Sequence, residues 1–209
     1  EDAFDIETVS DEFFTEYRRL FIETKLALDN VLLAEPSLKS AFEAKQINSV
    51  DFAKKLLGQI IFLYYLQKKG WFGVPKDGQW GEGSKNFLRE LFEKKHGAYQ
   101  NFFNGVLEPL FYDALRRDRS EVDHYHVHFK CKIPFLNGGL FDPIEDYDWV
   151  NTDLLLPNEL FANKEIVNGD EGTGILDVFD RYNFTVREDE SFEKEVAIDP
   201  ELLGKAYEK

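Results

Sequence analysis

The sequence contains no methionine, one cysteine and no apolar run long enough to cross a membrane. A lone Cys131 excludes an internal disulfide, and this scarcity of cysteine fits a reducing, cytoplasmic environment. The longest apolar run, Leu56 to Leu66, has 11 residues. A membrane-spanning helix needs about 20, so this run predicts a buried helix instead. Because methionine is missing even at position 1, we expect the chain to be a piece of a longer protein.

Basic residues are also scarce. The chain holds 25 Lys and Arg against 40 Asp and Glu, which gives a formal net charge of −15. The imbalance lies mainly in residues 142–209, with 19 acidic and 6 basic residues. Affinity for DNA phosphates comes largely from Lys and Arg, so an acidic chain is a poor stand-alone DNA binder. Any DNA contact should therefore be local or belong to attached domains.

Apolar residues are abundant: 43% of the chain is hydrophobic, including 20 Phe and 9 Tyr, which is enough for a real core. Apolar residues at helical spacing and capping residues predict four helices. They run from Ser10 to Pro36, from Ser49 to Gly70, from Ser84 to about Gly97, and from Tyr99 to Arg117 with a break at Pro109. We therefore expect a mainly α fold, with a bundle of about four to five helices over residues 1–120.

The second half is predicted to be an irregular α+β lobe, residues 121–198, packed on this bundle and containing a few short strands. In residues 124–133 an apolar residue occupies every second position, which predicts one strand with a buried and a solvated face. Residues 175–179 fit either a strand or a helical turn, and residues 182–186 fit an extended segment. Asp199, Pro200 and Glu201 predict the start of a helix over residues 199–209.

Candidate catalytic chemistry is weak throughout the chain. His124, His126 and His128 would share one face of the predicted strand, and such histidines can bind zinc or iron. The solvent-facing side of an edge strand explains these histidines better, because no carboxylate occurs at a spacing that would complete a metal site. Cys131 should be a small core residue. The glycine-rich residues 168–176 lack the strand and helix of a cofactor loop, so we interpret them as a loop. We assign no catalytic, cofactor-binding or metal residue, and a metal-binding or hydrolytic protein built on the histidine strand remains the alternative.

One region is less acidic than the rest. Residues 84–132 hold nine basic and seven acidic residues. If the longer protein contacts DNA through this chain, this is the surface to expect. The candidate contact residues are Arg116, Arg117, Arg119, Lys130 and Lys132.

Two short motifs combine turn-forming or polar residues with aromatic neighbours, as in ordered irregular segments held by buried rings. We expect both to lock the C-terminal lobe to the helical bundle, and either Gly138 or Gly139 to have a positive φ angle. The first motif is Asn137, Gly138 and Gly139; the second is Asp180, Arg181, Tyr182, Asn183 and Phe184.

Residues Gly174 to Lys209, GILDVFDRYNFTVREDESFEKEVAIDPELLGKAYEK, resemble the segment before the methyltransferase domain of large single-chain restriction–modification enzymes. These are the type IIG, IIL and ISP-like proteins and related phage-exclusion methyltransferases, which act in phage defence. The stretches LLGQIIFLYYLQKKGWFGV, FFNGVLEPLFYDAL, IPFLNGGLFDPI and LLLPNELF fit the same family in the same order. The resemblance covers essentially the whole chain and is most specific in its last third.

The resemblance implies that the chain is a helical connector between a nuclease and an N6-adenine methyltransferase, and that it positions these domains on DNA. In this family a target-recognition domain follows the methyltransferase. Its expected partners are these flanking domains and, through the longer protein, DNA. S-adenosylmethionine and Mg²⁺ would be cofactors of the longer protein, with none in this piece. The family's nuclease and methyltransferase motifs are missing here, so no catalytic residue can be carried over. The helix from Pro200 would continue into the methyltransferase domain.

Overall fold

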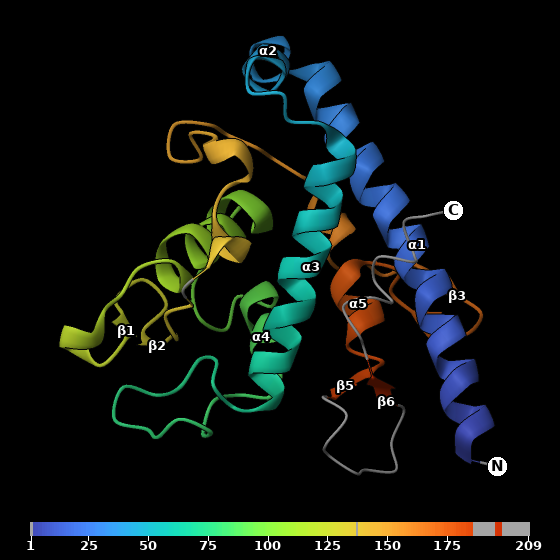
Figure 1. The fold of residues 1–209 in the computed structure, drawn as a ribbon, viewed down its shortest axis with the longest axis vertical. Helices are drawn as coiled ribbons and strands as arrows, with labels where there is room; N and C mark the ends of the chain where they lie inside the picture. The colour runs from blue at the N-terminus through green and yellow to red at the C-terminus, as the bar shows by residue number, and fades with distance from the viewer. Residues whose placement is uncertain (1, 137, 186–194, 198–209) are drawn as a thin grey trace.

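Two long helices, α1 (Asp2–Ala34) and α3 (Ser49–Lys68), run antiparallel along the molecule and are joined by the short α2 (Pro36–Ala44) (Figure 1). The computed structural model describes residues 2–136, 138–185 and 195–197. Its fold is mainly α-helical, with a few short strands in the C-terminal half, which confirms the predicted fold class. The division into residues 1–120 and 121–198 stays a prediction.

The buried face of α1 follows the helical period. Its side chains at this face are at most 1% exposed: Phe13, Tyr17, Leu20, Thr24 and Leu28. The helix ends at Ala34 because Pro36 keeps Glu35 out of the helical conformation (φ −126°). The prediction that the helix begins at Ser10 is wrong, since α1 begins at Asp2. The residues before Ser10 belong to the same helix, so Ser10 lies within the helix and is not its N-cap.

The third helix, α3, is buried on almost every side, as its apolar run predicts. Its N-cap is Asn48, one residue earlier than expected, and the Asn48 side chain accepts a hydrogen bond from the Asp51 N–H (2.8 Å). The helix ends at Lys68, and Gly70 follows with a positive φ of 69°. Glycine adopts this conformation without strain, so Gly70 is the predicted stop.

The next two predicted helices differ from the expectation. The first is short, with only α4 (Phe87–Phe92) helical. The second helix continues through Pro109 without a break. Pro109 lies between two π-helical turns, η1 (Phe103–Leu107) and η2 (Leu110–Leu115). A proline inside an α-helix clashes with the carbonyl four residues earlier and removes one hydrogen bond. The wider π turns accommodate Pro109 without breaking the helix.

Residues 124–133 form a hairpin instead of the single strand predicted. β1 (Tyr125–His126) pairs antiparallel with β2 (Cys131–Lys132), and the residues between them form the turn. The turn disrupts the alternation, so Val127 is 80% exposed whereas His126 is 8% exposed. The alternation correctly predicted extended structure. Each strand has only two residues, so the alternation could not predict which side chains are buried.

The remaining elements are brief. Three 3₁₀ turns follow the hairpin, η4 (Gly139–Phe141), η5 (Ile144–Asp146) and η6 (Asn158–Leu160), and another, η3 (Ser120–Val122), precedes it. β3 (Ile166–Val167) and β4 (Asp170–Glu171) form a second hairpin, and residues 175–179 are helical, as α5 (Ile175–Phe179). β5 (Asn183–Thr185) pairs in parallel with β6 (Glu195–Ala197).

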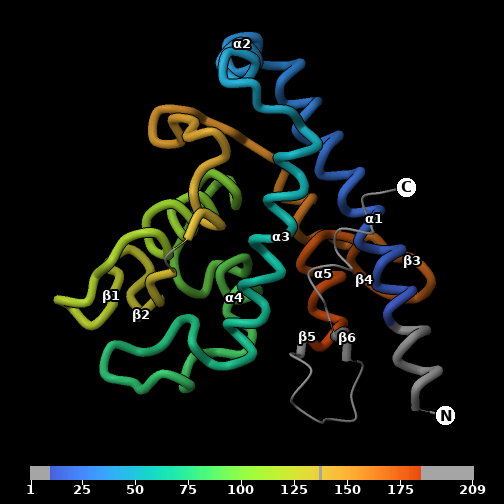
Figure 2. The backbone as a smooth tube through the Cα atoms, in the orientation of Figure 1, coloured from blue at the N-terminus to red at the C-terminus, as the bar shows by residue number. Residues whose placement is uncertain are grey.

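One hydrophobic core joins these parts, with buried side chains from Phe13 in α1 to Phe184 in β5. The segment from α5 to β5 lies between α1 and α3 (Figure 2). It therefore contacts both long helices at once. None of the described helices combines the length and hydrophobicity that a membrane crossing requires.

Candidate functional site

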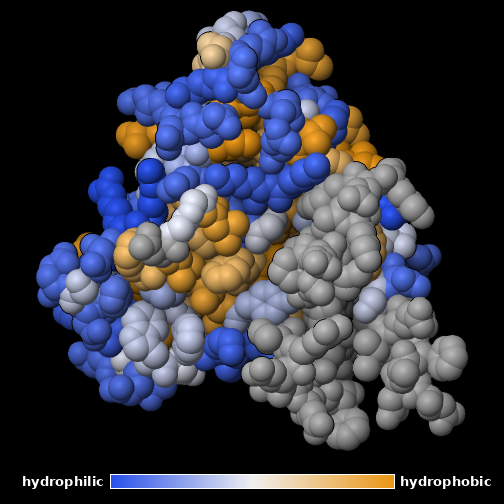
Figure 3. All heavy atoms as spheres, viewed as in Figure 1, coloured by the Kyte–Doolittle hydropathy of each residue, from blue (hydrophilic) through white to orange (hydrophobic). Residues whose placement is uncertain are grey.

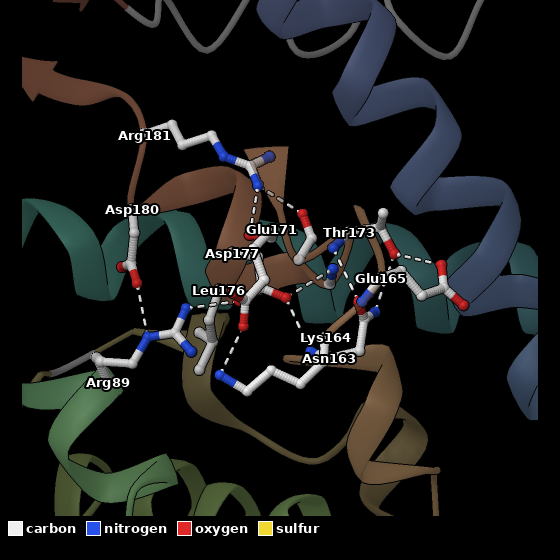
Figure 4. Close-up of polar contacts among 12 residues, drawn as sticks. Arg89, Asn163, Lys164, Glu165, Glu171, Thr173, Leu176, Asp177, Asp180 and Arg181 are labelled. Atoms are coloured by element: carbon white, nitrogen blue, oxygen red, sulfur yellow. Dashed lines mark hydrogen bonds and ion pairs between the residues drawn. The ribbon is translucent and has the colours of Figure 1, made fainter. Parts of the chain in front are cut away.

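A network of polar side chains lies where α5 packs against α4, and Asp177 is its centre (Figure 4). Asp177 is the third residue of α5 and is 8% exposed. Its Oδ2 accepts hydrogen bonds from the backbone N–H groups of Gly174 (3.0 Å) and Asn163 (2.9 Å). Its Oδ1 accepts from Nη2 of Arg89 (2.8 Å). The buried carboxylate thus caps its own helix and pairs with a cation on α4.

Arg89 also binds Asp180, through Nε and Oδ2 at 2.8 Å, and the Tyr64 hydroxyl donates to the other Asp180 oxygen at 2.6 Å. Burial opposes the charge on Arg89, but its bonds to the two aspartates raise its pKa above the usual value. Burial and the Asp180 charge raise the pKa of Tyr64 as well. Both groups therefore remain hydrogen-bond donors, and they tie α3, α4 and α5 together. We call this set (Tyr64, Arg89, Asp177 and Asp180) the junction.

Two glycines of the loop before α5 are explained by this packing. Gly172 has φ 95°, and a Cβ atom there would lie 2.4 Å from Cγ of Asp177. A Cβ on Gly174 would lie 2.5 Å from the backbone carbonyl carbon of Phe161. Arg181 donates from Nη2 to the carbonyls of Glu171 and Gly172 (2.9 and 2.5 Å). The two glycines allow the backbone of this loop to pack closely against Asp177 and Phe161. This packing explains why glycine occupies both positions, without reference to a cofactor.

Aromatic rings complete the attachment on the other side of α5. Phe184 lies 5.4 to 5.9 Å, between ring centroids, from Phe13, Tyr64, Tyr65 and Phe179. Such edge and tilted contacts each add to the stability gained from burial. The ring of Tyr182 lies 5.1 Å from that of Phe13.

The predicted motif at residues 180–184 thus contacts α1, α3 and α4. Sequence reasoning missed Arg89 and Tyr64 as its partners, and Asp177 as the second acid bound by Arg89. Asp177 had a readable signal, because an Asp three residues after Gly174 fits a helix N-terminus. For Arg89 and Tyr64 the sequence offers none, since their contacts cross about a hundred residues of chain.

The other predicted motif lies in the loop before η4. Gly138 has φ 125°, which confirms the expected positive φ, and Asn137 is outside the described residues. The loop is fastened to α3, because the side-chain amide of Gln59 donates to the carbonyl of Leu140 (2.8 Å). Phe141 is buried, with its ring 6.1 Å from that of Phe62. The loop therefore has a defined position on the surface of α3.

A second buried carboxyl group, Glu108, lies between the two π turns and has no cation partner in the part of the chain that the structure describes. It is fully buried and is hydrogen-bonded by the Tyr147 hydroxyl (2.8 Å) and the Asn104 amide (3.1 Å). Burial raises the pKa of Glu108 to about 8, although both hydrogen bonds oppose this shift. Burial thus favours the protonated form of Glu108, and its hydrogen bond with Tyr147 attaches the loop containing Tyr147 to the helix.

The predicted DNA-contact arginines have partners within the chain. Arg116 forms an ion pair with Asp142 (2.8 Å), and Arg117 forms one with Asp113 (3.2 Å). Arg119 donates to the backbone carbonyls of Arg117 and Ile133, both at 3.0 Å. These contacts reduce the positive charge available to a phosphate at this surface. The proposed DNA contact stays a prediction.

The two lysines of the same prediction differ. Lys132 is buried, and its ammonium group donates to Asp123 and to the carbonyl of Gly78. Lys130 is exposed and has a positive φ of 54° at the turn of the hairpin. Of the two, Lys130 alone is positioned to meet a partner in solution.

The three histidines do not gather around a common point. His126 is bonded through Nε2 to Asp113 (2.9 Å), and the ring of His124 lies 5.9 Å from that of Trp80. His128 packs against Phe129. Among the described residues, no three His, Cys, Asp or Glu side chains are placed to hold a metal ion. Cys131 is buried, which raises its thiol pKa to about 12, and so it is a core residue.

Sequence comparison finds a relative described as a putative type II restriction enzyme and methyltransferase of Methanocaldococcus jannaschii. It is 31% identical over 194 residues, which cover 89% of this chain. The chain spans 14% of the length of that relative. It is similar to one part of a restriction–modification protein. No family model matches the sequence, and no solved structure matches it.

Proposed function

We propose that this chain is a non-catalytic connector in a restriction–modification protein, where it holds a nuclease domain and an N6-adenine methyltransferase domain in fixed relative positions on DNA. The observation that carries the proposal is the similarity of almost the whole chain to a small part of a restriction enzyme and methyltransferase. The junction supports it, because it holds α5 and Asp180, in the segment that runs toward the C-terminus, against α3 and α4.

The proposal places the cofactors elsewhere in the longer protein. S-adenosylmethionine needs a glycine loop that approaches the ligand, but Gly172 and Gly174 approach Asp177 and Phe161. Mg²⁺ needs clustered oxygen ligands, and no such group of three acidic or histidine side chains occurs among the described residues. The proposal assigns both cofactors to the flanking domains.

The proposal also limits DNA contact. With a net charge of −15, the 209-residue chain should bind duplex DNA weakly at physiological salt. Replacing Arg116, Arg117 and Arg119 together in the longer protein tests the local contact predicted above. If this surface contacts phosphates, binding weakens and its salt dependence becomes shallower. Sequence-specific binding tighter than about micromolar by the 209-residue chain alone would assign it a recognition role instead.

The decisive experiment measures both activities in the longer protein. Asp180→Ala removes the acceptor shared by Arg89 and Tyr64, so the C-terminal segment should lose its fixed orientation. At a temperature where the variant remains folded, cleavage and methylation should fall together. Lys164→Ala, at a side chain that is 91% exposed, is the matched control and should leave both unchanged. Loss of one activity with the other intact contradicts the connector role.

A further inference from the structure

An open pocket lies where the C-terminal end of α3 meets the segment from α5 to β5. Its volume is about 910 Å³, within the range of roughly 300–1,000 Å³ that is typical of ligand sites. Its lining contains three basic residues, Lys68, Lys85 and Arg181, but only one acid, Asp180, among the described residues. This excess is unexpected in a chain with 25 basic and 40 acidic residues. We call this cavity the basic pocket.

Two lysines lie side by side in the basic pocket without an acidic partner. Lys85 precedes α4, and its ammonium group donates to the main-chain carbonyl of Lys68. Lys68 is half-buried, and neither ammonium group forms an ion pair among the described residues. The dipole of α3 favours a lysine at its C-terminal end, but Lys85 comes from a different segment. Two neighbouring cations repel each other, so a bound anion would stabilise both. Figure 3 shows strongly hydrophilic side chains at the surface near this end of α3.

The other charged groups of the lining are already occupied. Both oxygens of Asp180 accept hydrogen bonds, one from Arg89 (2.8 Å) and one from Tyr64 (2.6 Å). The guanidinium group of Arg181 donates to two main-chain carbonyls of the loop before α5, so we assign it no ligand. Charges elsewhere on the surface are largely screened beyond about 8 Å at physiological salt. The local charge of the pocket is therefore set mainly by the two lysines.

Gln67 supplies an unused hydrogen-bond donor. Its side chain is only 4% exposed, and its Oε1 accepts a hydrogen bond from the backbone N–H of Leu88 (3.1 Å). A backbone N–H is a donor, so this bond fixes which end of the amide is the oxygen. The Nε2 group is left without a hydrogen-bond partner among the described residues, although Gln67 lines the basic pocket. Buried polar groups are usually hydrogen-bonded, so a free N–H here indicates a ligand with an acceptor atom.

We propose that the basic pocket binds a phosphate group, which accepts hydrogen bonds from Nζ of Lys68, Nζ of Lys85 and Nε2 of Gln67. A phosphate has several acceptor oxygens and suits the compact charge of lysine, whereas arginine matches a planar carboxylate better. The inference goes beyond the connector role and does not depend on it. The helix predicted over residues 199–209 lies outside the described residues, and the proposed site uses described residues alone.

Titration of the full 209-residue chain with inorganic phosphate tests the proposal, with chloride keeping the ionic strength constant. Binding is followed by NMR through the amide signals of Gln67 and Leu88, which should shift and reach saturation. Lys68→Gln and Lys85→Gln should each weaken binding about tenfold, because each removes a hydrogen bond to a charged group. Lys39→Gln makes the same charge change on a half-exposed side chain of α2, at the opposite end of α3 (Figure 1). This control should leave the affinity unchanged.

Gln67→Glu separates binding from folding. The variant keeps an oxygen for the Leu88 N–H but replaces the free N–H donor with a second oxygen that repels phosphate. Binding should be lost, while circular dichroism should show a folded protein because the two lysines neutralise the new charge. If this variant does not fold, the two lysine variants decide, since their side chains are not fully buried. A folded Gln67→Glu protein that binds phosphate as tightly as the wild type overturns the proposal.

Two further ligands distinguish the sources of the phosphate. Deoxyadenosine monophosphate bound at least tenfold more tightly than inorganic phosphate would assign the basic pocket to a nucleotide. Duplex DNA bound by the longer protein more weakly after Lys68→Gln, but not after Lys39→Gln, would assign it to the DNA backbone. If neither occurs, the ligand is the free anion. The absence of a saturable shift with inorganic phosphate, or equal shifts in all three lysine variants, would overturn the proposal. Either failure leaves the connector role, which the two activities test, standing.

Discussion

The junction and the β1–β2 hairpin both place charged or polar side chains in the interior, but they satisfy them differently. At the junction, Asp177 receives three hydrogen bonds, one of them from a cation. In and beside the hairpin, Nε of Arg119, Nδ1 of His124 and Nδ1 of His126 are buried without a partner among the described residues. An unpaired buried polar atom costs stability that a paired one does not. The junction should therefore contribute to stability, and the hairpin should tolerate change.

The largest effect is expected at Asp177. Asp177→Ala removes the helix cap and leaves the half-buried Arg89 with Asp180 as its one remaining anionic partner among the described residues. Removing one member of a buried ion pair costs roughly 3–5 kcal/mol, so unfolding in urea should show a loss of about 3 kcal/mol or more. Asp142→Ala, which breaks the half-exposed pair with Arg116, is the matched control and should cost less than about 1 kcal/mol. Equal losses would remove the distinction between buried and surface pairs.

Glu108 sharpens the comparison, because it is a buried acid without a cation. Its folded-state pKa, about 8, is above the unfolded value, so the folded protein binds more protons between about pH 4.5 and 8. Stability from this group is complete below that range and falls as pH rises, by at most about 1.4 kcal/mol per pH unit. Glu108→Gln should remove this fall.

The measurement is denaturant unfolding of wild type and Glu108→Gln from pH 5 to 8. The variant should gain stability relative to the wild type as pH increases, because the amide keeps the hydrogen-bonding shape without a charge. A difference that stays constant over this range would show that Glu108 is ionised in the folded protein. Asp142→Asn, at a half-exposed acid, should show no comparable trend.

Substitutions at two glycines distinguish the cost of a positive φ angle from the cost of a clash between a Cβ atom and its neighbours. Gly172 and Gly138 both have positive φ, but a Cβ atom meets Asp177 only at Gly172. Gly172→Ala should therefore cost about 2 kcal/mol or more, and Gly138→Ala about 1 kcal/mol from strain alone. Gly139, whose φ is not positive and whose Cβ would make only an ordinary contact, should tolerate alanine. Thermal unfolding of the three variants tests this order, and a larger cost at Gly138 than at Gly172 would contradict it.

The sequence predicted features that depend on local chemistry. The apolar run of α3, its stop at Gly70 and the positive φ of Gly138 follow from spacing and from backbone preferences. It could not predict the π turns around Pro109 or the hairpin at residues 124–133, because these depend on what packs against them. The junction was predicted only in part. The sequence indicated Asp180, but its partner Arg89 is far away in sequence and no local pattern marks it.

The smallest effect is expected in the hairpin, and it has the opposite sign. Lys130 is exposed and has φ 54°, a conformation that costs a non-glycine residue about 1 kcal/mol. Its backbone N–H donates to the carbonyl of His126 (2.8 Å), and glycine would preserve this bond. Lys130→Gly relieves the strain but also gives the unfolded chain more freedom, so the net gain should be about 0.5 kcal/mol or less. Careful thermal melts should show a small rise in Tm, with Lys130→Ala as a control that keeps the strain. If Lys130→Gly instead lowered stability by more than 0.5 kcal/mol, the side chain would have a structural contact in the hairpin, and this region would be no more tolerant than the junction.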